Sequence, residues 1–248
     1  MLDFGFYNMD CMEGMKQFPD KYFDLAVVDP PYGINMGHTC GIGQGGGERP
    51  FSGNYTRVWG EHKSISKAKF YHPFDDSSTP DGKYFEELFR VSKEQVVWGG
   101  NFFLDYLDRA TCMIVWDKGR RGMDQADCEI AWTSLKGQSR IFNWKWNGML
   151  QEDMKNKEPR IHPTQKPVEL YKWILNTFAN KDDIILDTHA GSASSLIACH
   201  RTGHKYVGFE IDEYYYKMAK KRLDAEMSQM TIFDIYNDDT LYGQESRT

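Results

Sequence analysis

The sequence predicts a layered α/β fold, in which helices pack against a central sheet. Patterns typical of strands and helices alternate along most of the 248 residues, as expected for such a fold. Two short, largely apolar runs, residues 25–28 and 183–186, stop abruptly at an acid, Asp29 and Asp187. Runs of this length with these boundaries indicate buried strands. Two further strand patterns, residues 126–133 and 139–146, are typical of the antiparallel edge that often completes such a sheet.

Composition favours one soluble domain. A chain of 248 residues can bury an adequate core without staples, and we expect one domain over residues 1–228, followed by a tail over 229–248. No apolar segment approaches membrane-spanning length, and the first residues lack the features of a signal peptide, so we expect a cytoplasmic protein. The five cysteines include no Cys-x-x-Cys pair, so neither a disulfide framework nor a metal site is predicted.

Charge is unevenly distributed along the chain. The net charge of -6 argues mildly against extensive nucleic-acid binding, but residues 34–72 carry five basic and two acidic side chains. A locally basic surface on an acidic body fits a protein that engages DNA over one face, and an ordinary solvated loop is the alternative. The same segment contains a Gly-x-Gly-x-x-Gly at residues 41–46 that neither follows a strand nor opens a helix. It is therefore not a dinucleotide fingerprint, and we interpret residues 34–72 as a mobile loop that orders on substrate, or as simple disorder.

The first half of the chain alternates strands and helices. Residues 4–9 have a strand pattern and are followed by a short amphipathic segment to residue 18. Pro30 lacks a backbone donor, so the next strand ends before it. Asp81 is a suitable N-cap for a helix to residue 90. Strands are then expected over residues 95–98 and 111–116, with a short helix over 102–107 between them, and residues 126–133 and 139–146 are expected to pair across a turn at residues 136–137.

The second half repeats the alternation after a charged surface excursion over residues 147–160. Pro167 suits the first turn of a helix that runs to about residue 179. The strand at residues 183–186 leads through a turn of small residues into a helix to residue 200. A strand then covers residues 205–209, and Asp212 caps a helix to about residue 227.

The segment Asp29-Pro30-Pro31-Tyr32 directly follows a predicted buried strand. Ligand-binding groups of open α/β sheets lie at this end of the strands. The two prolines fix their own φ angles and push the preceding residues towards extended conformations, so a carboxylate, a carbonyl and an aromatic ring are held rigidly. A strand followed by a proline-rich turn is the plain alternative, and a second motif favours the functional interpretation.

That second motif lies in the later half of the chain. Asp187 ends one strand, small residues lead into a helix, and Glu210 ends the next strand about twenty residues on. This arrangement suits a nucleoside cofactor, because small residues let backbone amides approach a ligand and the second carboxylate can bind ribose hydroxyls. A packing turn between strand and helix would also favour small residues.

Taken together, three segments resemble, in this order, the β group of amino-directed DNA methyltransferases: Asp29-Pro30-Pro31-Tyr32, His162-Pro163-Thr164-Gln165-Lys166-Pro167, and Asp187-x-x-x-Gly191-Ser192. The resemblance covers residues 4–226. It implies a Rossmann-like, mostly parallel seven-stranded sheet with helices on both faces, S-adenosylmethionine as the methyl donor, and an exocyclic amine of a DNA base as the acceptor. Asp at the first motif position resembles the adenine-N6 type, since the cytosine-N4 type usually carries Ser there.

The proposed chemistry assigns a role to each motif. The Asp29 carboxylate and the Pro30 carbonyl accept the two amine hydrogens, Pro31 keeps the turn rigid, and Tyr32 stacks on a base rotated out of the duplex. The resemblance implies a cofactor site with Glu210 on the ribose, Asp10 and Cys11 beside the adenine, and Asp29, Lys166, Asp187, His189, Ala190, Gly191 and Ser192 around the methionine end. Base recognition would fall to residues 34–72 and 117–160.

The cofactor loop departs from the family pattern Asp-Pro-Phe-x-Gly-Ser-Gly-Thr. Thr188 and Ser194 replace Pro and Thr, His189 replaces Phe, and Ala193 replaces the second Gly. Ala193 adds only a methyl group and is expected to preserve binding if its φ is negative. His189 is expected to weaken the cofactor site or to make it sensitive to pH.

Several partners and alternatives follow from these motifs. Double-stranded DNA is the expected partner, in the setting of DNA modification and restriction, and a homodimer is left open. Residues Gln229 to Phe233 resemble the pentapeptide by which bacterial replication proteins dock on the sliding clamp, with an ordinary helix-to-tail transition as the alternative. The other activities left open are a cytosine-N4, RNA or protein-glutamine N-methyltransferase and a non-catalytic DNA or clamp adaptor of the same fold.

Overall fold

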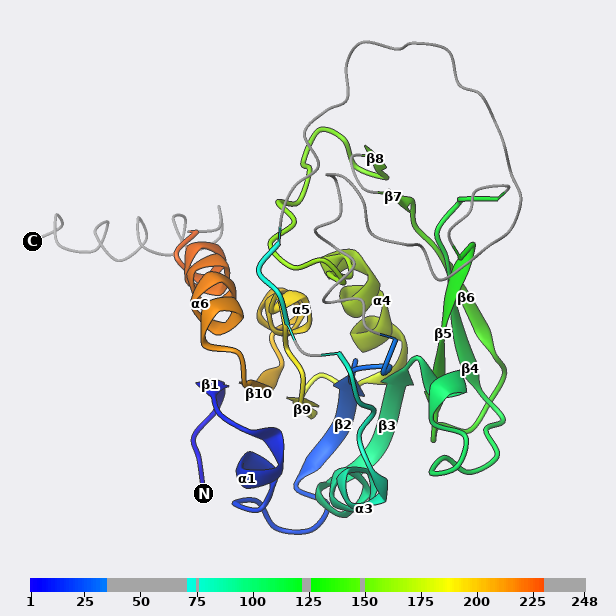
Figure 1. Ribbon diagram of the computed structural model, residues 1–248, viewed down its shortest axis with the longest axis vertical. Coiled ribbons are helices and arrows are strands. Elements are labelled where there is room, and N and C mark those ends of the chain that lie inside the picture. The colour runs from blue at the N-terminus through cyan, green and yellow to red at the C-terminus, as the bar shows by residue number, and fades with distance from the viewer. Residues whose placement is uncertain (35–70, 75, 122–125, 148–149, 230–248) are drawn as a thin grey trace, which may run out of the picture.

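The structure is a computed structural model that describes residues 1–34, 71–74, 76–121, 126–147 and 150–229 (Figure 1). Strands and helices alternate over residues 5–98 and 168–227, and strands alone follow one another over residues 113–151. The strands are β1 (Gly5–Asn8), β2 (Phe23–Val28), β3 (Ser92–Trp98), β4 (Met113–Asp117), β5 (Cys128–Thr133), β6 (Arg140–Asn143), β7 (Trp146–Asn147), β8 (Leu150–Gln151), β9 (Ile184–Asp187) and β10 (Lys205–Glu210). The helices are α1 (Cys11–Met15), α3 (Gly82–Val91), α4 (Val168–Phe178), α5 (Ser194–Thr202) and α6 (Glu213–Met227), with one 3-10 turn, η1 (Gly100–Phe102).

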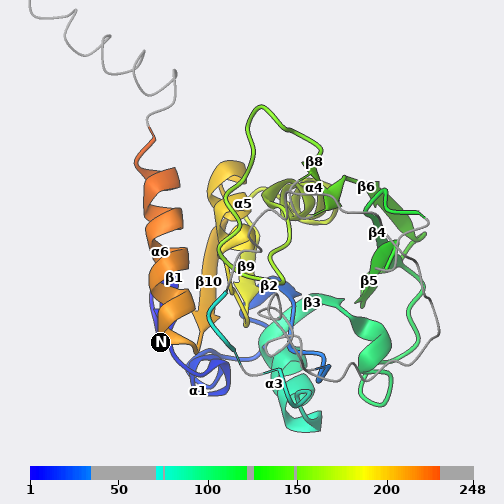
Figure 2. The same ribbon diagram turned by 45° about the horizontal axis from the view of Figure 1, so that its top comes forward.

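One sheet organises the described residues, with the strand order β1-β10-β9-β2-β3-β5-β4-β6. In this order, the five strands from β1 to β3 are parallel to one another. β5 is antiparallel to both β3 and β4, and β6 is parallel to β4. The edge strands β1 and β6 lie on opposite sides of the molecule (Figure 2). The layered α/β fold expected from the sequence is confirmed.

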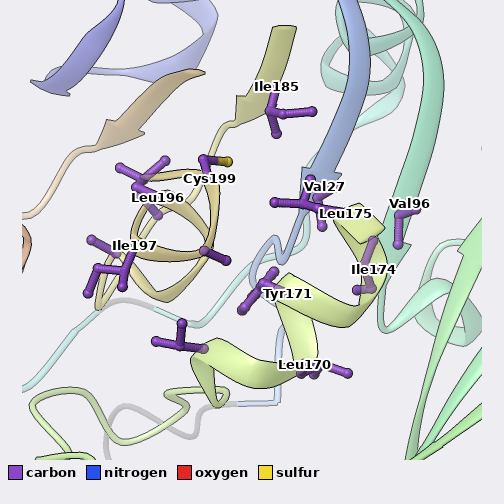
Figure 3. Packing of buried hydrophobic residues seen from close by; sticks show 14 of the residues in the cluster. Val27, Val96, Leu170, Tyr171, Ile174, Leu175, Ile185, Leu196, Ile197 and Cys199 are labelled. Carbon is purple, nitrogen blue, oxygen red and sulfur yellow. The ribbon is translucent and has the colours of Figure 1, made fainter. Parts of the chain in front are cut away.

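Helices cover both faces of the parallel half of the sheet, with α4, α5 and α6 on one face and α1 and α3 on the other (Figure 1). Alternate residues of each strand point to opposite faces. In β2, Val27 therefore packs with α4 and α5, whereas Val28 packs with α1 and α3. Figure 3 shows Val27 with Ile174 and Leu175 of α4 in the first of these cores.

Helix capping follows the sequence closely. The Asp81 side chain accepts hydrogen bonds from the amides of Lys83 and Tyr84 at the start of α3. Asp212 accepts one from the Tyr215 amide at the start of α6. Because a side-chain oxygen satisfies amides that have no partner within the helix, both helices begin at the positions that the sequence predicted.

The middle of the chain corrects the predicted topology. The two strands predicted over residues 126–133 and 139–146 do not form a hairpin, because β4 lies between β5 and β6 in the sheet. The antiparallel strand is therefore internal and not at the edge. Ala131 and Trp132 of β5 are both buried, as an internal strand requires. β6 is almost entirely exposed and adds an eighth strand to the seven expected.

The helix predicted over residues 102–107 is also wrong. The chain forms the single 3-10 turn η1 instead, preceded by Gly99 in the left-handed conformation. The amide of Phe103 bonds to the carbonyl of Gly100, and the amide of Tyr106 bonds to that of Phe103. These i to i+3 bonds form consecutive tight turns, which still bury Phe103 at 1 % exposure.

Candidate active site

Four acidic residues lie at the carboxyl ends of four neighbouring strands, at the same edge of the sheet. In the order β1-β10-β9-β2, these residues are Asp10, Glu210, Asp187 and Asp29. β9 and β2 are paired in parallel, with Leu186 opposite Ala26. Glu210 pairs with Asn8, two residues before Asp10. The sequence predicted that the strand ends carrying Asp29 and Asp187 would meet, and the structure brings them together.

The Asp29 carboxylate is bound on both oxygens. Its Oδ1 accepts a 2.6 Å hydrogen bond from the Tyr32 hydroxyl, and its Oδ2 pairs with the Lys166 ammonium. The Tyr32 ring stacks on Phe102, with ring centroids 4.9 Å apart and planes inclined by 14°. Pro30 is buried and Pro31 half-buried, so the Asp-Pro-Pro-Tyr turn is held between β2 and the turn that follows β3.

Gly99 makes this position of Tyr32 possible. A Cβ atom at residue 99 would lie 2.3 Å from Cε1 of Tyr32, and Gly99 has a φ of +66°. Glycine alone adopts this conformation without steric cost and leaves room for the ring.

Lys166 is buried between two carboxylates. Its side chain is 3 % exposed, and its Nζ lies 3.1 Å from Oε2 of Glu129 as well as beside Asp29. Burial lowers the pKa of Lys166, but the charges of Asp29 and Glu129 outweigh this effect and raise the pKa overall. Lys166 is therefore a stable ammonium. The sequence placed Lys166 near the methionine end of the cofactor, which stays a prediction, and the structure adds its contact with Asp29.

Glu129 is held in turn by a second lysine. It pairs with Lys118, which follows β4. Burial alone would raise the pKa of Glu129, but the charges of Lys166 and Lys118 lower it to about 2. Lys118, Glu129, Lys166 and Asp29 thus form a line of alternating charges, which we call the ion chain.

Hydrogen bonds connect the cofactor loop after β9 with its two carboxylates, Asp187 and Glu210. The Asp187 carboxylate accepts bonds from the Ser195 hydroxyl and, at 3.0 Å, from the His189 amide. The Gly191 amide donates a 2.8 Å bond to Oε2 of Glu210, and the Asp212 amide donates a 2.9 Å bond to Oε1 of Glu210. The second carboxylate of the predicted cofactor motif is therefore joined to the loop of the first.

Ala193 differs from the sequence-based expectation. Its φ is +58°, in the left-handed region. The sequence predicted that cofactor binding would be preserved if this φ were negative. The methyl group is fully buried among apolar residues of the α4, α5 and α6 face. The loop therefore keeps a backbone shape that glycine usually adopts, at a steric cost.

The charges of the cofactor loop suit a cationic ligand. Burial raises the pKa of Asp187 to about 7 despite the opposing hydrogen bonds from Ser195 and His189, and the nearby carboxylates of Asp29 and Glu210 add a smaller increase. A buried carboxylate with such neighbours is stabilised by a positive ligand. S-adenosylmethionine carries a sulfonium and an ammonium group, so the residues present fit it.

The structure places His189 in a partly buried position beside Thr188, and its effect on the cofactor site stays a prediction. Burial lowers the pKa of His189 to about 4, so its ring is neutral at pH 7. Its Nδ1 lies 2.9 Å from the Thr188 hydroxyl, which in turn lies 2.7 Å from the hydroxyl of Tyr84. Any sensitivity to pH near neutrality is therefore expected from Asp187 and not from His189.

The remaining predicted cofactor residues lie at the same edge. Asp10 caps α1, because its Oδ1 accepts a 2.7 Å bond from the Met12 amide. Burial and the charge of Asp10 raise the pKa of the Cys11 thiol to about 12, so the thiol is neutral. The Ala190 amide donates to the Phe209 carbonyl, and the Ser192 hydroxyl lies 3.1 Å from that of Ser194.

Sequence reasoning missed several supporting residues. Glu129 and Lys118 were not singled out, although Glu129 is an acid within an otherwise apolar strand, a pattern that signals a buried partner. Arg222 of α6 donates to the Ser192 carbonyl at 2.8 Å and pairs with Glu158 at 2.6 Å. No local pattern marks Arg222, since it lies among other charged residues of α6.

Three predicted regions lie partly outside the described residues. Of the loop predicted over residues 34–72, residues 35–70 lie outside them. The clamp-like segment has only Gln229 among the described residues. The candidate DNA-recognition region, 117–160, is described except for residues 122–125 and 148–149, and it contributes Lys118 and Glu129 to the ion chain.

The fold and this arrangement define the chain as an α/β protein with the S-adenosylmethionine-dependent methyltransferase fold. The solved complex of M1.HpyAVI with S-adenosylmethionine is 18% identical, with a TM-score of 0.51, over 88% of this chain and 98% of that one. The PvuII DNA methyltransferase, described as cytosine-N4-specific, is 13% identical, with a TM-score of 0.54, over 96% of this chain and 92% of that one. The predicted fold class is thus confirmed, and S-adenosylmethionine is the expected cofactor.

Sequence comparisons narrow this class. A family model described as DNA methylase, of the N6/N4 type, matches residues 117–221. The type II methyltransferase M2.DpnII of Streptococcus pneumoniae is 24% identical over 88% of this chain and 89% of its own length. YubD of Escherichia coli (strain K12), provisionally named a methylase, is 25% identical over 91% of this chain and 92% of its own length. These matches support a DNA methyltransferase, without separating adenine N6 from cytosine N4.

Within the part of the chain that the structure describes, every helix is too short or too polar to cross a membrane.

Proposed function

We propose that this chain is a site-specific DNA adenine-N6 methyltransferase that acts on an adenine rotated out of the duplex. The observation that carries the proposal is the pairing of β2 with β9. This pairing brings the Asp29 motif beside the loop of Asp187, so that an amine and a methyl donor can meet at one sheet edge. S-adenosylmethionine, when bound, supplies an electrophilic methyl group on a sulfonium.

Binding of the methyl donor would fall to the β1, β10 and β9 ends of the edge. Glu210 would hold the ribose, Asp10 and Cys11 would lie beside the adenine of the cofactor, and Asp187 with residues 189–192 would hold the methionine end. Burial raises the pKa of both Asp187 and Glu210, which supports this assignment because a cationic ligand stabilises a buried carboxylate.

Binding of the acceptor amine would fall to Asp29 and Pro30. The amine of adenine is a poor nucleophile because its lone pair is delocalised into the ring. Acceptors on both N–H groups favour a more tetrahedral nitrogen with its lone pair directed at the methyl group. Oδ1 of Asp29 already accepts a bond from Tyr32, and a carboxylate oxygen can accept a second. Tyr32 would then stack on the extruded base.

The choice of adenine over cytosine rests on the Asp of the Asp29 motif. The structural likeness to the cytosine-N4-specific PvuII enzyme makes cytosine N4 the second candidate. Incubation with isotopically labelled S-adenosylmethionine and unmethylated duplex DNA, followed by nucleoside mass spectrometry, separates the two. We expect label in N6-methyladenine, and label confined to N4-methylcytosine would refute the adenine assignment.

The substrate class is tested in the same experiment. Label in RNA, or on a protein glutamine, would show another N-methyltransferase, and binding without any transfer would show a non-catalytic adaptor. Asp29→Ala is expected to abolish transfer while calorimetry still detects cofactor binding. Turnover by Asp29→Ala at the wild-type rate would refute the role of Asp29.

The remaining parts of the proposal concern partners and organisation. Residues 1–228 would form the catalytic domain of a cytoplasmic protein, and residues 229–233 would dock on a sliding clamp. Titration of a peptide spanning residues 226–236 against the clamp tests the docking, and an absence of affinity would refute it. Light scattering of the purified chain distinguishes a monomer from a homodimer.

A further inference from the structure

The ion chain extends from β4 and β5 into the proposed active site. Lys118 pairs with Glu129, Glu129 lies 3.1 Å from Lys166, and Lys166 pairs with Asp29. Residues Asp29 and Lys166 are 137 positions apart in the sequence, and Glu129 reaches them from the only antiparallel strand of the sheet among the described residues.

The Lys166 ammonium has three polar neighbours. It donates to Oδ2 of Asp29 and, at 3.3 Å, to the hydroxyl of Tyr32, and its Nζ lies 3.1 Å from Oε2 of Glu129. A lysine ammonium has three donors, so each of these neighbours limits its orientation. Tyr32 donates its own proton to Oδ1 of Asp29, which leaves Oδ2 of that carboxylate to Lys166.

Stability alone does not account for this arrangement. Moving an ammonium out of water costs several kcal/mol, and a buried ion pair often stabilises a fold no more than well-packed apolar residues do. Lys166 would need only one counter-charge to be neutralised, and Asp29 provides it. Glu129 supplies a second, which fixes the direction from which the ammonium approaches Asp29.

We propose that Glu129 is a positioning residue for methyl transfer, which acts through Lys166 to hold the Asp29 carboxylate in one orientation. This inference rests on the proposed function. Glu129 makes no direct contact with Asp29 in this arrangement, so its effect on the reaction is expected on the rate of transfer and not on cofactor affinity. Lys118 completes the arrangement by neutralising the outer side of Glu129.

Glu129→Gln is the decisive variant, because glutamine has the shape of glutamate without its charge. Glu87→Gln is its matched control, since Glu87 is also partly buried, at 17% exposure, and pairs with Arg90 at 2.7 Å on α3. A displacement of about 1 Å in a positioned group can reduce turnover about a hundredfold, and this is the fall in kcat expected for Glu129→Gln. For Glu87→Gln we expect a change within about twofold, as for substitutions away from a site.

The cofactor and the pH profile provide the readouts that a purely structural role would not change. The Kd of S-adenosylmethionine should stay within about twofold of wild type in both variants. With one counter-charge removed, Lys166 should lose its proton at a lower pH. The pH above which kcat falls should therefore be lower in Glu129→Gln than in wild type, and unchanged in Glu87→Gln. The titratable groups that act on Lys166 or its two carboxylates from the surrounding elements include Tyr32, Tyr84, Lys118, Arg120, His162, Tyr171 and Asp187.

Nitrogen NMR of the lysine ammonium groups in the cofactor-free protein gives a second measurement, with Lys166→Met to assign the signal. The Nζ of Lys166 should titrate at a lower pH in Glu129→Gln than in wild type. If Glu129→Gln does not fold, Glu129→Asp replaces it, because aspartate keeps the charge but withdraws the carboxylate by one methylene. Glu129→Asp should then lower kcat in a folded protein.

The outcomes separate the two proposals. If the wild-type protein transfers methyl groups and Glu129→Gln, or Glu129→Asp in its place, matches its kcat, the positioning role is refuted and the proposed function stands. An equal loss of kcat in Glu87→Gln would also refute it, because the effect would then be general. If the wild-type protein transfers no methyl group to DNA, the proposed function fails and the inference fails with it.

Discussion

Replacement of Gly99 by alanine tests the geometry around Tyr32. The new Cβ would lie 2.3 Å from Cε1 of the Tyr32 ring, where ordinary contact begins at 3.4 Å. The backbone of Gly99 continues directly from β3 and cannot move without disturbing the sheet, so the ring must withdraw by about 1 Å. Tyr32 would then lose its stacking on Phe102 and its hydrogen bond to Asp29.

The cost has three contributions. An alanine in the left-handed conformation costs about 1–2 kcal/mol. Loss of a hydrogen bond to a charged group costs about 1.5–3 kcal/mol, and loss of the aromatic pair costs about 0.5–1.5 kcal/mol. We therefore expect the free energy of unfolding of Gly99→Ala to fall by about 3–6 kcal/mol in urea titrations, together with a large loss of methyl transfer.

Gly203→Ala is the matched control. Gly203 has a φ of +76°, and no heavy atom lies within 4 Å of the position that its Cβ would take. This variant should therefore show only the backbone strain, about 1–2 kcal/mol, with transfer unchanged. Equal losses of stability in the two variants would show that Tyr32 adapts freely, and would refute the argument from its position.

Three further predictions concern the cofactor loop. The pKa of Asp187, about 7 against 3.8, means that the folded protein binds this proton more tightly than the unfolded chain does. The free energy of unfolding of the wild-type protein should therefore fall as the pH rises from about 4 to 7. Asp187→Asn should raise the free energy of unfolding at pH 8 by at most about 4 kcal/mol and should not raise it at pH 4. An equal effect at both pH values in urea titrations would contradict this. His189→Phe removes the contact with Thr188 and should lower the free energy of unfolding by about 1 kcal/mol. Calorimetry should show the same pH dependence of cofactor binding as in wild type. If this pH dependence disappears in the variant, it belongs to His189. Ala193→Gly relieves about 1–2 kcal/mol of backbone strain, but it removes a buried methyl group worth about 0.8 kcal/mol and makes the unfolded chain less restricted. These effects offset one another, so the midpoint of unfolding should hardly change. A large fall in the midpoint would refute this balance.

The parts of the fold that local chemistry determines were predictable. β2 and β9 are short apolar runs that stop at an acid, and Asp81 and Asp212 cap α3 and α6 at the predicted positions. The strand order in the middle of the chain was not predictable in this way. The sequence pattern of β5 identifies a strand but not the neighbours of that strand. In the structure, β5 buries Trp132 on one face and Ala131 on the other, as expected for a strand inside the sheet.

The site was predictable where its residues lie at strand ends, and not where they meet across the fold. Asp29, Asp187 and Glu210 were singled out because each ends a strand, and the sheet brings those ends to one edge. The contact of Lys166 with Asp29 spans 137 residues. Glu129 contacts Lys166 from β5, the strand whose place in the sheet was itself predicted wrongly. Local sequence patterns therefore could not have paired Glu129 with Lys166.

The charges at the sheet edge divide the work of the proposed reaction between two sides. On the β2 side, the charge of Asp29 is matched within the protein by Lys166, so that carboxylate gains little from a cationic ligand and can serve as a hydrogen-bond acceptor for a neutral amine. On the β9 side, burial disfavours the charge of Asp187, and the carboxylates of Asp29 and Glu210 add to this effect, so a cation that binds there stabilises the charge. An electrophile with a positive charge is thus drawn to one strand end and a neutral nucleophile to the next. Because β2 and β9 are paired strands, about 4.8 Å apart, the two sides are close enough for direct transfer.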